Sequence, residues 1–516
     1  MWRQLTGSIV DADLIAVNEK PGARVVFGGD VSLGRRQNAH SASNPSEALE
    51  DVPQLKEADL AIVNLESVVA NQGEFDVEKG ESGPYYFRGR PETLRVLTEQ
   101  GIDIVQTANN HSGDYGTAAL LEQLDLLDQA GIGHAGAGPT RDAACSPTFR
   151  RAGDVQVAFF GLDATMPYFS AWADRAGTCF LSLADTQAWQ HLLATRIEQA
   201  RRRAHVVMVG VHWGDNWQEV PSQRKRRVAQ ALVNAGADAI LGTSAHLVQG
   251  VQMIDGRPVI HDAGNLLFDF VEDRTMATGV FTFVLSKLGI IQLWFDPLRG
   301  RAGRTETAKG AFRAEVLELV AARSRGLGSE ATFTKSHRLV WELIPATDRP
   351  EPTELLPPNP LRPRAPAAAL TPPGDCISVA VPEDARIEPV KHGPLTLLGM
   401  RVDPQKITKR DMLFVETWWR VDKPVTDDFW IRSQLVPIDG SENHTWLGDH
   451  EPCDWLWPTS RFKPGVIYRD KYGVRPPDNR GLMNGTLMLK TGVLHKRKVV
   501  GRLTDGPLVL VERTEY

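Results

Sequence analysis

Residues 205–246 read HVVMVGVHWGDNWQEVPSQRKRRVAQALVNAGADAILGTSAH and contain one strand–helix–strand unit. Residues 205–211 and 239–242 are short apolar runs rich in β-branched residues, which predicts two buried strands. Residues 222–235 between them have apolar positions at helical spacing and predict a helix. His212 follows the first strand, and His246 comes soon after the second. Since ligands bind at the carboxyl ends of strands in open α/β sheets, we expect the chemistry of this chain there.

The same alternation continues on both sides of this unit. Strands are predicted at 24–27, 60–63, 102–106, 155–160 and 257–261, and helices at 91–99, 116–130 and 186–203. Residues 280–295 are the most apolar later stretch, but Ser286, Lys287 and Gly289 interrupt it. They predict two strands with a turn, too short and broken to span a bilayer. The pattern indicates an α/β domain over residues 25–344, preceded by an extension at 1–24.

A proline-rich segment divides the chain. Residues 345–374 have no apolar periodicity and predict an extended, semi-rigid linker. Residues 375–516 consist of short apolar runs separated by Pro, Gly, Asp and Asn, which is typical of an all-β sandwich. Aromatic faces in this region could stack on sugar rings or dock a peptide, but we prefer packing in the core or at a domain interface. The tryptophans concerned are Trp418, Trp419, Trp430, Trp446, Trp455 and Trp457.

Composition excludes several classes of protein. A chain of 516 residues with 42% apolar and 24% charged residues predicts a soluble globular protein with two or three domains. The 58 basic and 64 acidic residues leave a net charge of -6, so we expect no nucleic-acid partner. The first 22 residues lack the pattern of a secretory signal. We therefore expect a cytoplasmic protein, or one peripheral to a membrane complex, without a transmembrane segment.

The four cysteines lie far apart in the sequence. Cys145, Cys179, Cys376 and Cys453 show no CxxC spacing, which fits neither a disulfide framework nor a thiolate zinc site. We expect reduced thiols.

Five short motifs follow predicted strands: Gly29-Asp30, Asn64-Leu65-Glu66, Asn109-Asn110-His111, His212-Trp213-Gly214 and Gly242–His246. They present carboxylate, amide and imidazole groups without thiolate, a mixture that suits one or two Mn, Zn, Fe or Mg ions. Each motif alone has a simpler interpretation. Asp30 could close a turn, Glu66 could cap a helix and His111 could be a core imidazole. Their common placement favours a metal site.

Residues from about 25 to 269 resemble the CapA/PgsA family of poly-γ-glutamate capsule synthesis proteins, whose fold is that of the calcineurin-like metallophosphatases. The resemblance rests on VVFGGDVSLGR, NLESVV, IVQTANNHSGDYG and VHWGDNWQEVPSQ. It implies a four-layer α/β sandwich, and the β region loosely resembles an immunoglobulin-like sandwich. It also implies that His111 is the acid/base group and that the metal ligands are Asp30, Glu66, Asn110, His212 and His246.

Two further residues are candidates for catalysis. Asp114 could orient the His111 imidazole or simply begin the following helix, and these interpretations are equal. Arg35 could receive a carboxylate or phosphate through paired hydrogen bonds, although a surface arginine is the commoner case. His111 suits acid/base work because the ordinary pKa of an imidazole lies near neutrality.

The sequence departs from the family at one place. Family members usually carry a second histidine in the stretch that is Thr243-Ser244-Ala245 here, so either a mononuclear or a loosely dinuclear site is expected. His261 could restore a nitrogen donor, but a buried structural histidine is the preferred interpretation.

The resemblance implies a metal-dependent enzyme of capsule or poly-γ-glutamate biosynthesis, or of related peptide modification. Its substrate would be peptide-like or polyanionic. Metal-assisted acid/base chemistry would permit hydrolysis of a phosphoester or amide, or proton abstraction at Cα and hence epimerisation. The alternative is a non-catalytic polymer-binding or scaffold subunit with a degenerate metal site. Partner proteins of capsule or peptide biosynthesis are expected in either case.

Overall fold

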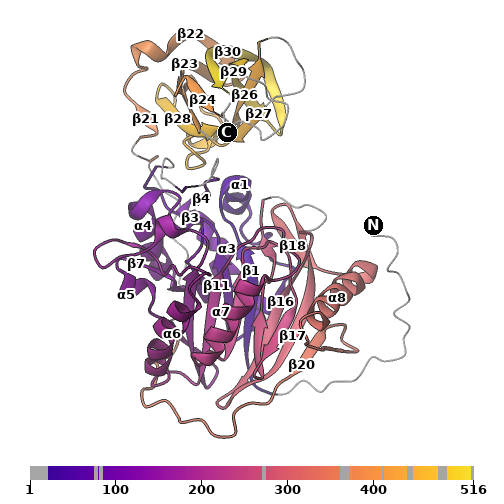
Figure 1. The fold of residues 1–516 in the computed structure, drawn as a ribbon. Helices are drawn as coiled ribbons and strands as arrows, with labels where there is room; N and C mark the ends of the chain where they lie inside the picture. Colours follow the sequence, from indigo (N-terminus) through magenta and orange to yellow (C-terminus); the bar gives the residue numbers. More distant parts are fainter. Residues whose placement is uncertain are drawn as a thin grey trace.

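The computed structural model describes residues 21–74, 79–80, 85–269, 275–360, 372–373, 375–408, 412–438, 446–474 and 485–512. Most of the predicted extension at 1–24 and the second half of the predicted linker lie outside these residues. Figure 1 shows an α/β domain with a smaller, β-rich domain at one end.

The larger sheet of the first domain carries parallel strands at one side and antiparallel strands at the other. The parallel strands are β1 (Ala23–Val31), β2 (Leu60–Leu65), β5 (Ile104–Gln106) and β6 (Gly133–Ala135). The antiparallel strands are β16 (Ala277–Ser286), β17 (Gly289–Arg301), β20 (Leu339–Glu342) and β19 (Thr332–Phe333). β15 (Asn265–Leu267) pairs with β1, and β18 (Arg304–Thr307) pairs with β17.

The second sheet contains the unit that the sequence predicts at 205–246. Its parallel strands are β9 (Val155–Asp163), β11 (Val206–His212), β12 (Ala239–Thr243) and β14 (Arg257–Ile260). β8 (Thr148–Ala152) and β13 (Val251–Ile254) are antiparallel neighbours at its edges. The predicted strands of both sheets are confirmed, because long β-branched runs buried on both faces specify strands locally.

Helices cover the outer faces of the two stacked sheets. Phe27 and Phe281 of the larger sheet share one buried core with Phe159 and Met208 of the second. On the outside of the larger sheet lie α2 (Pro53–Glu57), α3 (Arg95–Glu99) and α4 (Gly116–Gln129). On the outside of the second sheet lie α6 (Thr186–Ala200) and α7 (Gln223–Asn234). α8 (Gly310–Arg325) closes the core at one edge.

The first half of the predicted linker packs on the first domain. Arg349 Nη2 lies 2.7 Å from Asp238 Oδ1, and the backbone N–H of Leu356 donates to Gln156 Oε1 at 2.6 Å. Asn359 pairs with the backbone of Arg151 in both directions. This segment, the orange trace that runs along the first domain in Figure 1, is therefore fixed by side-chain contacts.

The C-terminal region is β-rich. One sheet contains β21 (Ile377–Ser378), β28 (Ile467–Val474), β25 (Leu413–Val421), β23 (Leu395–Asp403) and β22 (Arg386–His392). The other contains β24 (Lys406–Thr408), β30 (Lys498–Glu512), β29 (Gly485–His495), β26 (Trp430–Pro437) and β27 (Trp446–His450). The two sheets share a core. As preferred from the sequence, the buried tryptophans pack inside the domain, namely Trp418, Trp419, Trp455 and Trp457. Trp430 is half-buried, and the Trp446 side chain lies outside the described residues.

The expectation of reduced thiols is wrong. Cys145 is bonded to Cys179, and Cys376 to Cys453, with Cα–Cα distances of 5.0 and 5.3 Å. Spacing along the sequence does not report these pairs, because folding brings together cysteines 34 and 77 residues apart. Among the described helices, none has both the length and the apolar composition that a membrane span needs.

Candidate metal and acid–base site

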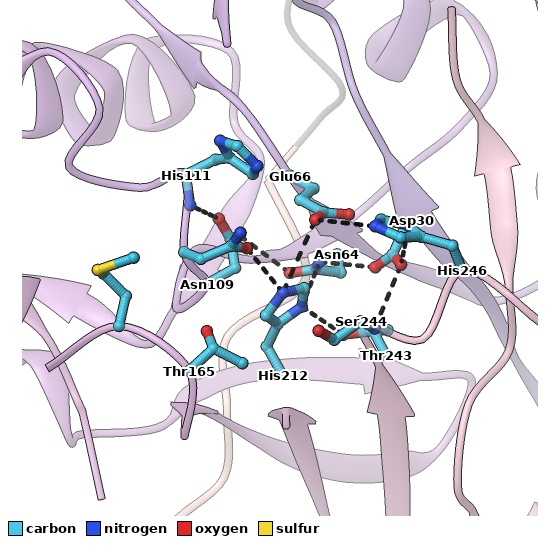
Figure 2. Close-up of polar contacts among 12 residues, drawn as sticks. Asp30, Asn64, Glu66, Asn109, His111, Thr165, His212, Thr243, Ser244 and His246 are labelled. Carbon is cyan, nitrogen blue, oxygen red and sulfur yellow. Dashed lines mark hydrogen bonds and ion pairs between the residues drawn. The ribbon is translucent and has the colours of Figure 1, made fainter. Parts of the chain in front are cut away.

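The candidate site lies where parallel strands of both sheets end. Asp30 of β1 is in register with Asn64 of β2, and His212 ends β11 in register with Thr243 of β12. β1 contacts β12 across the two sheets. The carboxyl ends of four strands therefore meet at one place, as shown in Figure 2.

Three predicted ligands form one buried cluster. Asp30, Glu66 and His246 each offer an atom within 4.8 Å of the others. His246 Nδ1 lies 3.6 Å from Asp30 Oδ2, and His246 Nε2 lies 3.9 Å from Glu66 Oε1. All three side chains are almost inaccessible to solvent. Two carboxylates and an imidazole at these distances are a donor set that suits a divalent cation.

The other two predicted ligands lie beside this cluster. His212 Nε2 lies 2.9 Å from Asn110 Oδ1 and 3.7 Å from Glu66 Oε1. Glu66 Oε1 thus lies between the two histidines (Figure 2). The structure brings all five predicted ligands together around the Glu66 carboxylate.

Asn64 connects the two halves of the site. Its Nδ2 donates to Asp30 Oδ1 at 2.8 Å and lies 3.2 Å from His212 Nδ1 (Figure 2). The same His212 nitrogen lies 3.0 Å from Thr243 Oγ1. Sequence reasoning noted the Asn64 motif but assigned no role to it. Its position at the end of a strand, two residues before Glu66, was the available signal.

The electrostatics of the cluster fit a bound cation. Burial raises the pKa of Asp30, and burial together with the Asp30 charge raises the pKa of Glu66 well above its ordinary value. Glu66 Oε2 is buried and has no hydrogen-bond partner among the described residues. Burial lowers the pKa of His212 well below the ordinary value, which favours a neutral imidazole. A divalent cation would bind the Glu66 oxygen that has no hydrogen-bond partner. It would also offset the negative charges of the neighbouring Asp30 and Glu66 carboxylates.

His111 is held by Asp114, close in the sequence, and by Lys79 and Phe87 from farther away. Its Nδ1 lies 2.6 Å from Asp114 Oδ2, and Asp114 Oδ1 lies 2.5 Å from the buried Lys79 Nζ. The Phe87 ring stacks on the imidazole with centroids 3.9 Å apart. Burial lowers the pKa of His111 to about 4, although Asp114 opposes this effect. Asp114 contacts the imidazole, while α4 begins only at Gly116. No pattern in the sequence indicated a role for Lys79 or Phe87.

Arg35 packs on the Phe87 ring that stacks on His111, and it lies outside the metal cluster. Its Nη2 is 2.6 Å from Asp269 Oδ1, and its guanidinium lies 4.3 Å above the Phe87 ring. The Arg35 side chain is 26% exposed. A partly exposed guanidinium beside a candidate acid/base group can bind an anionic part of a ligand.

The family match covers this site. The model of the family described as bacterial capsule synthesis protein PGA_cap matches residues 24–270. The first domain belongs to this PGA_cap family.

Relatives of the PGA_cap domain include the following bacterial proteins. The PGA biosynthesis protein CapA of Bacillus subtilis (strain 168) is 25% identical over 53% of this chain and 70% of its own length. The capsule biosynthesis protein CapA of Bacillus anthracis is 25% identical over 50% of this chain and 62% of its own. A probable polyglutamine synthesis accessory protein of Mycobacterium tuberculosis (strain CDC 1551 / Oshkosh) is 26% identical over 41% and 56%. These names indicate a part in capsule or poly-γ-glutamate biosynthesis for the family.

The alkylpurine DNA glycosylase AlkC of Pseudomonas fluorescens matches 23% of this chain and 30% of its own at 11% identity, with a TM-score of 0.17. A similarity this weak does not indicate a shared fold.

Residues 261–265, which follow β14, contact the chain around the PGA_cap site. Asp262 accepts hydrogen bonds from the backbone N–H groups of Ala245 and Gly264, and Asn265 Oδ1 lies 2.9 Å from His246 Nδ1. His261 instead stacks on Trp213, and its Nε2 lies 2.9 Å from Gln252 Oε1. Burial lowers its pKa to about 3. His261 is therefore a buried structural residue, as preferred from the sequence, and does not replace the missing histidine.

Proposed function

We propose that the PGA_cap domain is a metal-dependent enzyme of capsule or poly-γ-glutamate biosynthesis, or of related peptide modification. The observation that carries the proposal is the buried cluster of Asp30, Glu66 and His246, in which one oxygen of Glu66 has no hydrogen-bond partner among the described residues. The stacked sheets with outer helices support a metallophosphatase-like four-layer sandwich, and the two C-terminal sheets support an immunoglobulin-like domain.

Asp30, Glu66 and His246 would hold one divalent ion, either Mn, Zn, Fe or Mg. Asn110 and His212, with Glu66 between them and His246, would provide a second and weaker position. Such an ion supplies Lewis acidity that polarises a carbonyl or phosphoryl group. Asn64 and Thr243 hold the His212 ring through Nδ1, which directs its Nε2 toward Glu66.

His111 would accept or donate the proton that is transferred in the reaction. Because Asp114 holds Nδ1, the imidazole presents Nε2 as the atom that accepts or donates a proton. With a nearby ion, this arrangement suits hydrolysis of a phosphoester or amide. Removal of a proton from Cα, hence epimerisation, needs the same base and a polarised carbonyl.

Arg35 would bind the anionic part of the substrate. Its guanidinium is partly exposed, and its charge acts on His111. This supports a peptide-like or polyanionic substrate whose carboxylate or phosphate lies near the base.

A scaffold subunit is the second candidate function. The absence of a histidine from Thr243-Ser244-Ala245 weakens the second metal position, and one Mycobacterium tuberculosis relative is named an accessory protein. In that case the β-rich domain would dock partners of the biosynthetic complex.

The two disulfides bear on location. Structural disulfides persist mainly in oxidising compartments. They favour such a compartment over the cytoplasmic location expected from the sequence.

The deciding experiment combines metal analysis with assays on purified protein. Bis(p-nitrophenyl) phosphate and a γ-glutamyl peptide are assayed with added Mn or Zn, and deuterium incorporation at Cα is measured in heavy water. The variant His111→Ala is compared with His191→Ala, which changes an exposed histidine of α6. Bound metal with turnover lost only in His111→Ala supports the enzyme. Protein without metal and without turnover supports the scaffold.

A further inference from the structure

The β-rich domain touches the first domain next to His111. The contact includes residues 451–457, which form a turn between β27 and β28, and β4 (Arg88–Gly89) with its neighbours in the first domain. Figure 1 shows the β-rich domain at the end of the first domain where β3 (Val68–Val69), β4 and α1 (Arg35–Ser43) lie.

The turn at 451–457 has an unusual backbone. Cys453, Asp454 and Trp455 have φ angles of 57°, 51° and 70°, in the left-handed region that residues other than glycine rarely adopt. The disulfide to Cys376 fixes the first of them, and the Trp455 N–H donates to Glu451 O at 3.0 Å. Such a backbone persists where surrounding contacts determine it, so the direction of the Asp454 side chain is set by the turn.

Asp454 binds two residues of the first domain. Its Oδ2 lies 2.6 Å from Arg88 Nη2, and its carboxylate forms a hydrogen bond with the Tyr115 side chain. The Arg88 guanidinium lies 4.0 Å above the Tyr115 ring. The Arg88 and Asp454 side chains are 5% and 13% exposed, so solvent screens this pair little.

Both partners of Asp454 are direct neighbours of the groups that hold His111. Arg88 follows Phe87, which stacks on the imidazole and whose backbone N–H donates to Asp114 Oδ2 at 2.7 Å. Tyr115 follows Asp114 in the chain. One carboxylate of the β-rich domain thus joins the two segments on either side of His111.

Further contacts fix the position of the turn. Asn38 Nδ2 donates to Trp455 O at 2.6 Å, while Asn38 Oδ1 accepts from Arg90 N at 2.8 Å. Arg90 Nη2 lies 3.3 Å from Glu451 Oε2. These groups are buried. They fix the position of the β-rich domain relative to β4, which a flexible linker between the two domains would not do.

We propose that Asp454 is a positioning residue for His111, so that the β-rich domain completes the site of the first domain through the disulfide-bonded turn 451–457. The inference rests on the proposed function only in assigning His111 a role in turnover. Loss of the Asp454 contacts should loosen Phe87 and Asp114 and leave Asp30, Glu66 and His246 in place.

The test uses Asp454→Asn in the full chain. Its matched control is Asp505→Asn, which removes an ion pair with Lys490 inside the β-rich domain. Hydrogen exchange of residues 85–92 is measured by mass spectrometry, together with metal content and the kcat and KM for bis(p-nitrophenyl) phosphate. For Asp454→Asn we expect exchange at 85–92 to rise and kcat to fall by about tenfold each, with KM and metal content unchanged. Asp505→Asn should behave as the wild type.

A second variant separates positioning from general destabilisation. Cys376→Ser/Cys453→Ser should raise exchange at 85–92 in the same way, and dithiothreitol should reproduce this in the wild type but add nothing in the variant. Unchanged exchange at 85–92 in folded Asp454→Asn overturns the inference. An equal rise at 206–212, on a strand that the turn does not touch, also overturns it. If the wild type has no turnover, the proposed function fails, while the exchange measurements still decide the positioning.

Discussion

The imidazole Nδ1 of His111 lies 2.6 Å from Oδ2 of Asp114 in a buried environment. The other oxygen of that carboxylate lies 2.5 Å from the buried Lys79 ammonium. Asp114 is thereby held between a cation and the ring, and the ring is fixed with one nitrogen engaged. This relationship gives the proposed base a defined orientation before any substrate binds.

Asp114→Asn should reduce kcat on the order of 10²-fold, because an amide neither fixes the same tautomer nor favours the protonated imidazole. KM and bound metal should stay near the wild-type values. Steady-state kinetics and metal analysis measure both. Asp125→Asn, at an exposed position of α4, the helix that follows Asp114, is the control. Equal kcat in Asp114→Asn and the wild type would show that Asp114 has only a structural role.

Glu66→Gln and His246→Ala should each weaken binding of Mn or Zn at least tenfold, because each removes a ligand from the same cluster. Titration with metal, followed by elemental analysis, gives the affinities. Asp163→Asn is the control. That carboxylate is also buried, with a pKa raised to about 6 by burial, but it accepts hydrogen bonds from Thr165 and Met166. If both ligand variants bind metal as tightly as the wild type, the proposed metal centre is contradicted.

Arg35→Ala should raise the KM for a γ-glutamyl peptide about tenfold, because a charge-assisted pair with the substrate carboxylate is lost. Arg35→Lys should recover only part of the affinity, since an ammonium does not match the paired geometry. A substrate whose carboxylate is converted to an amide serves as the comparison. If both substrates lose affinity equally, Arg35 does not recognise the anion.

Glu451 should make stability depend on pH. Burial raises its pKa from 4.5 to about 7, and the attraction of Arg90 offsets this only in part. The folded chain then binds this proton more tightly than the unfolded chain, so stability falls as pH rises between about 4.5 and about 7. Glu451→Gln should not show this loss. Between those two pH values the free energy of unfolding of the wild type should therefore fall by up to about 3 kcal/mol more than that of Glu451→Gln. Urea unfolding at both ends of that pH window measures the difference, with Glu383→Gln, an exposed change, as the control.

Thiol titration checks the covalent structure. The protein contains four cysteines, and the structure pairs all of them. Unfolded, unreduced protein should therefore react with no equivalents of a thiol reagent, and reduced protein with four. Reactive thiols before reduction would contradict the pairing.

The sequence by itself determined the strands, the helices between them and the placement of five polar motifs after strands, while the choice of five expected ligands within those motifs came from the resemblance to the family. Apolar runs such as 206–211 specify strands locally, and parallel strands carry Asp30 and Glu66 to one edge of the larger sheet, and His212 and His246 to one edge of the second. That reasoning needs only short stretches of chain and a rule of sheet topology.

Only the tertiary structure decided which side chains act on one another. Asn64, which donates to Asp30, reaches His212 across 148 residues, and Asp454 reaches Arg88 across 366. The disulfide pairs and the packing of the predicted linker were decided in the same way. Such contacts depend on strand order, register and domain docking, which follow from burying the whole apolar surface and leave no periodic signal near the residues involved.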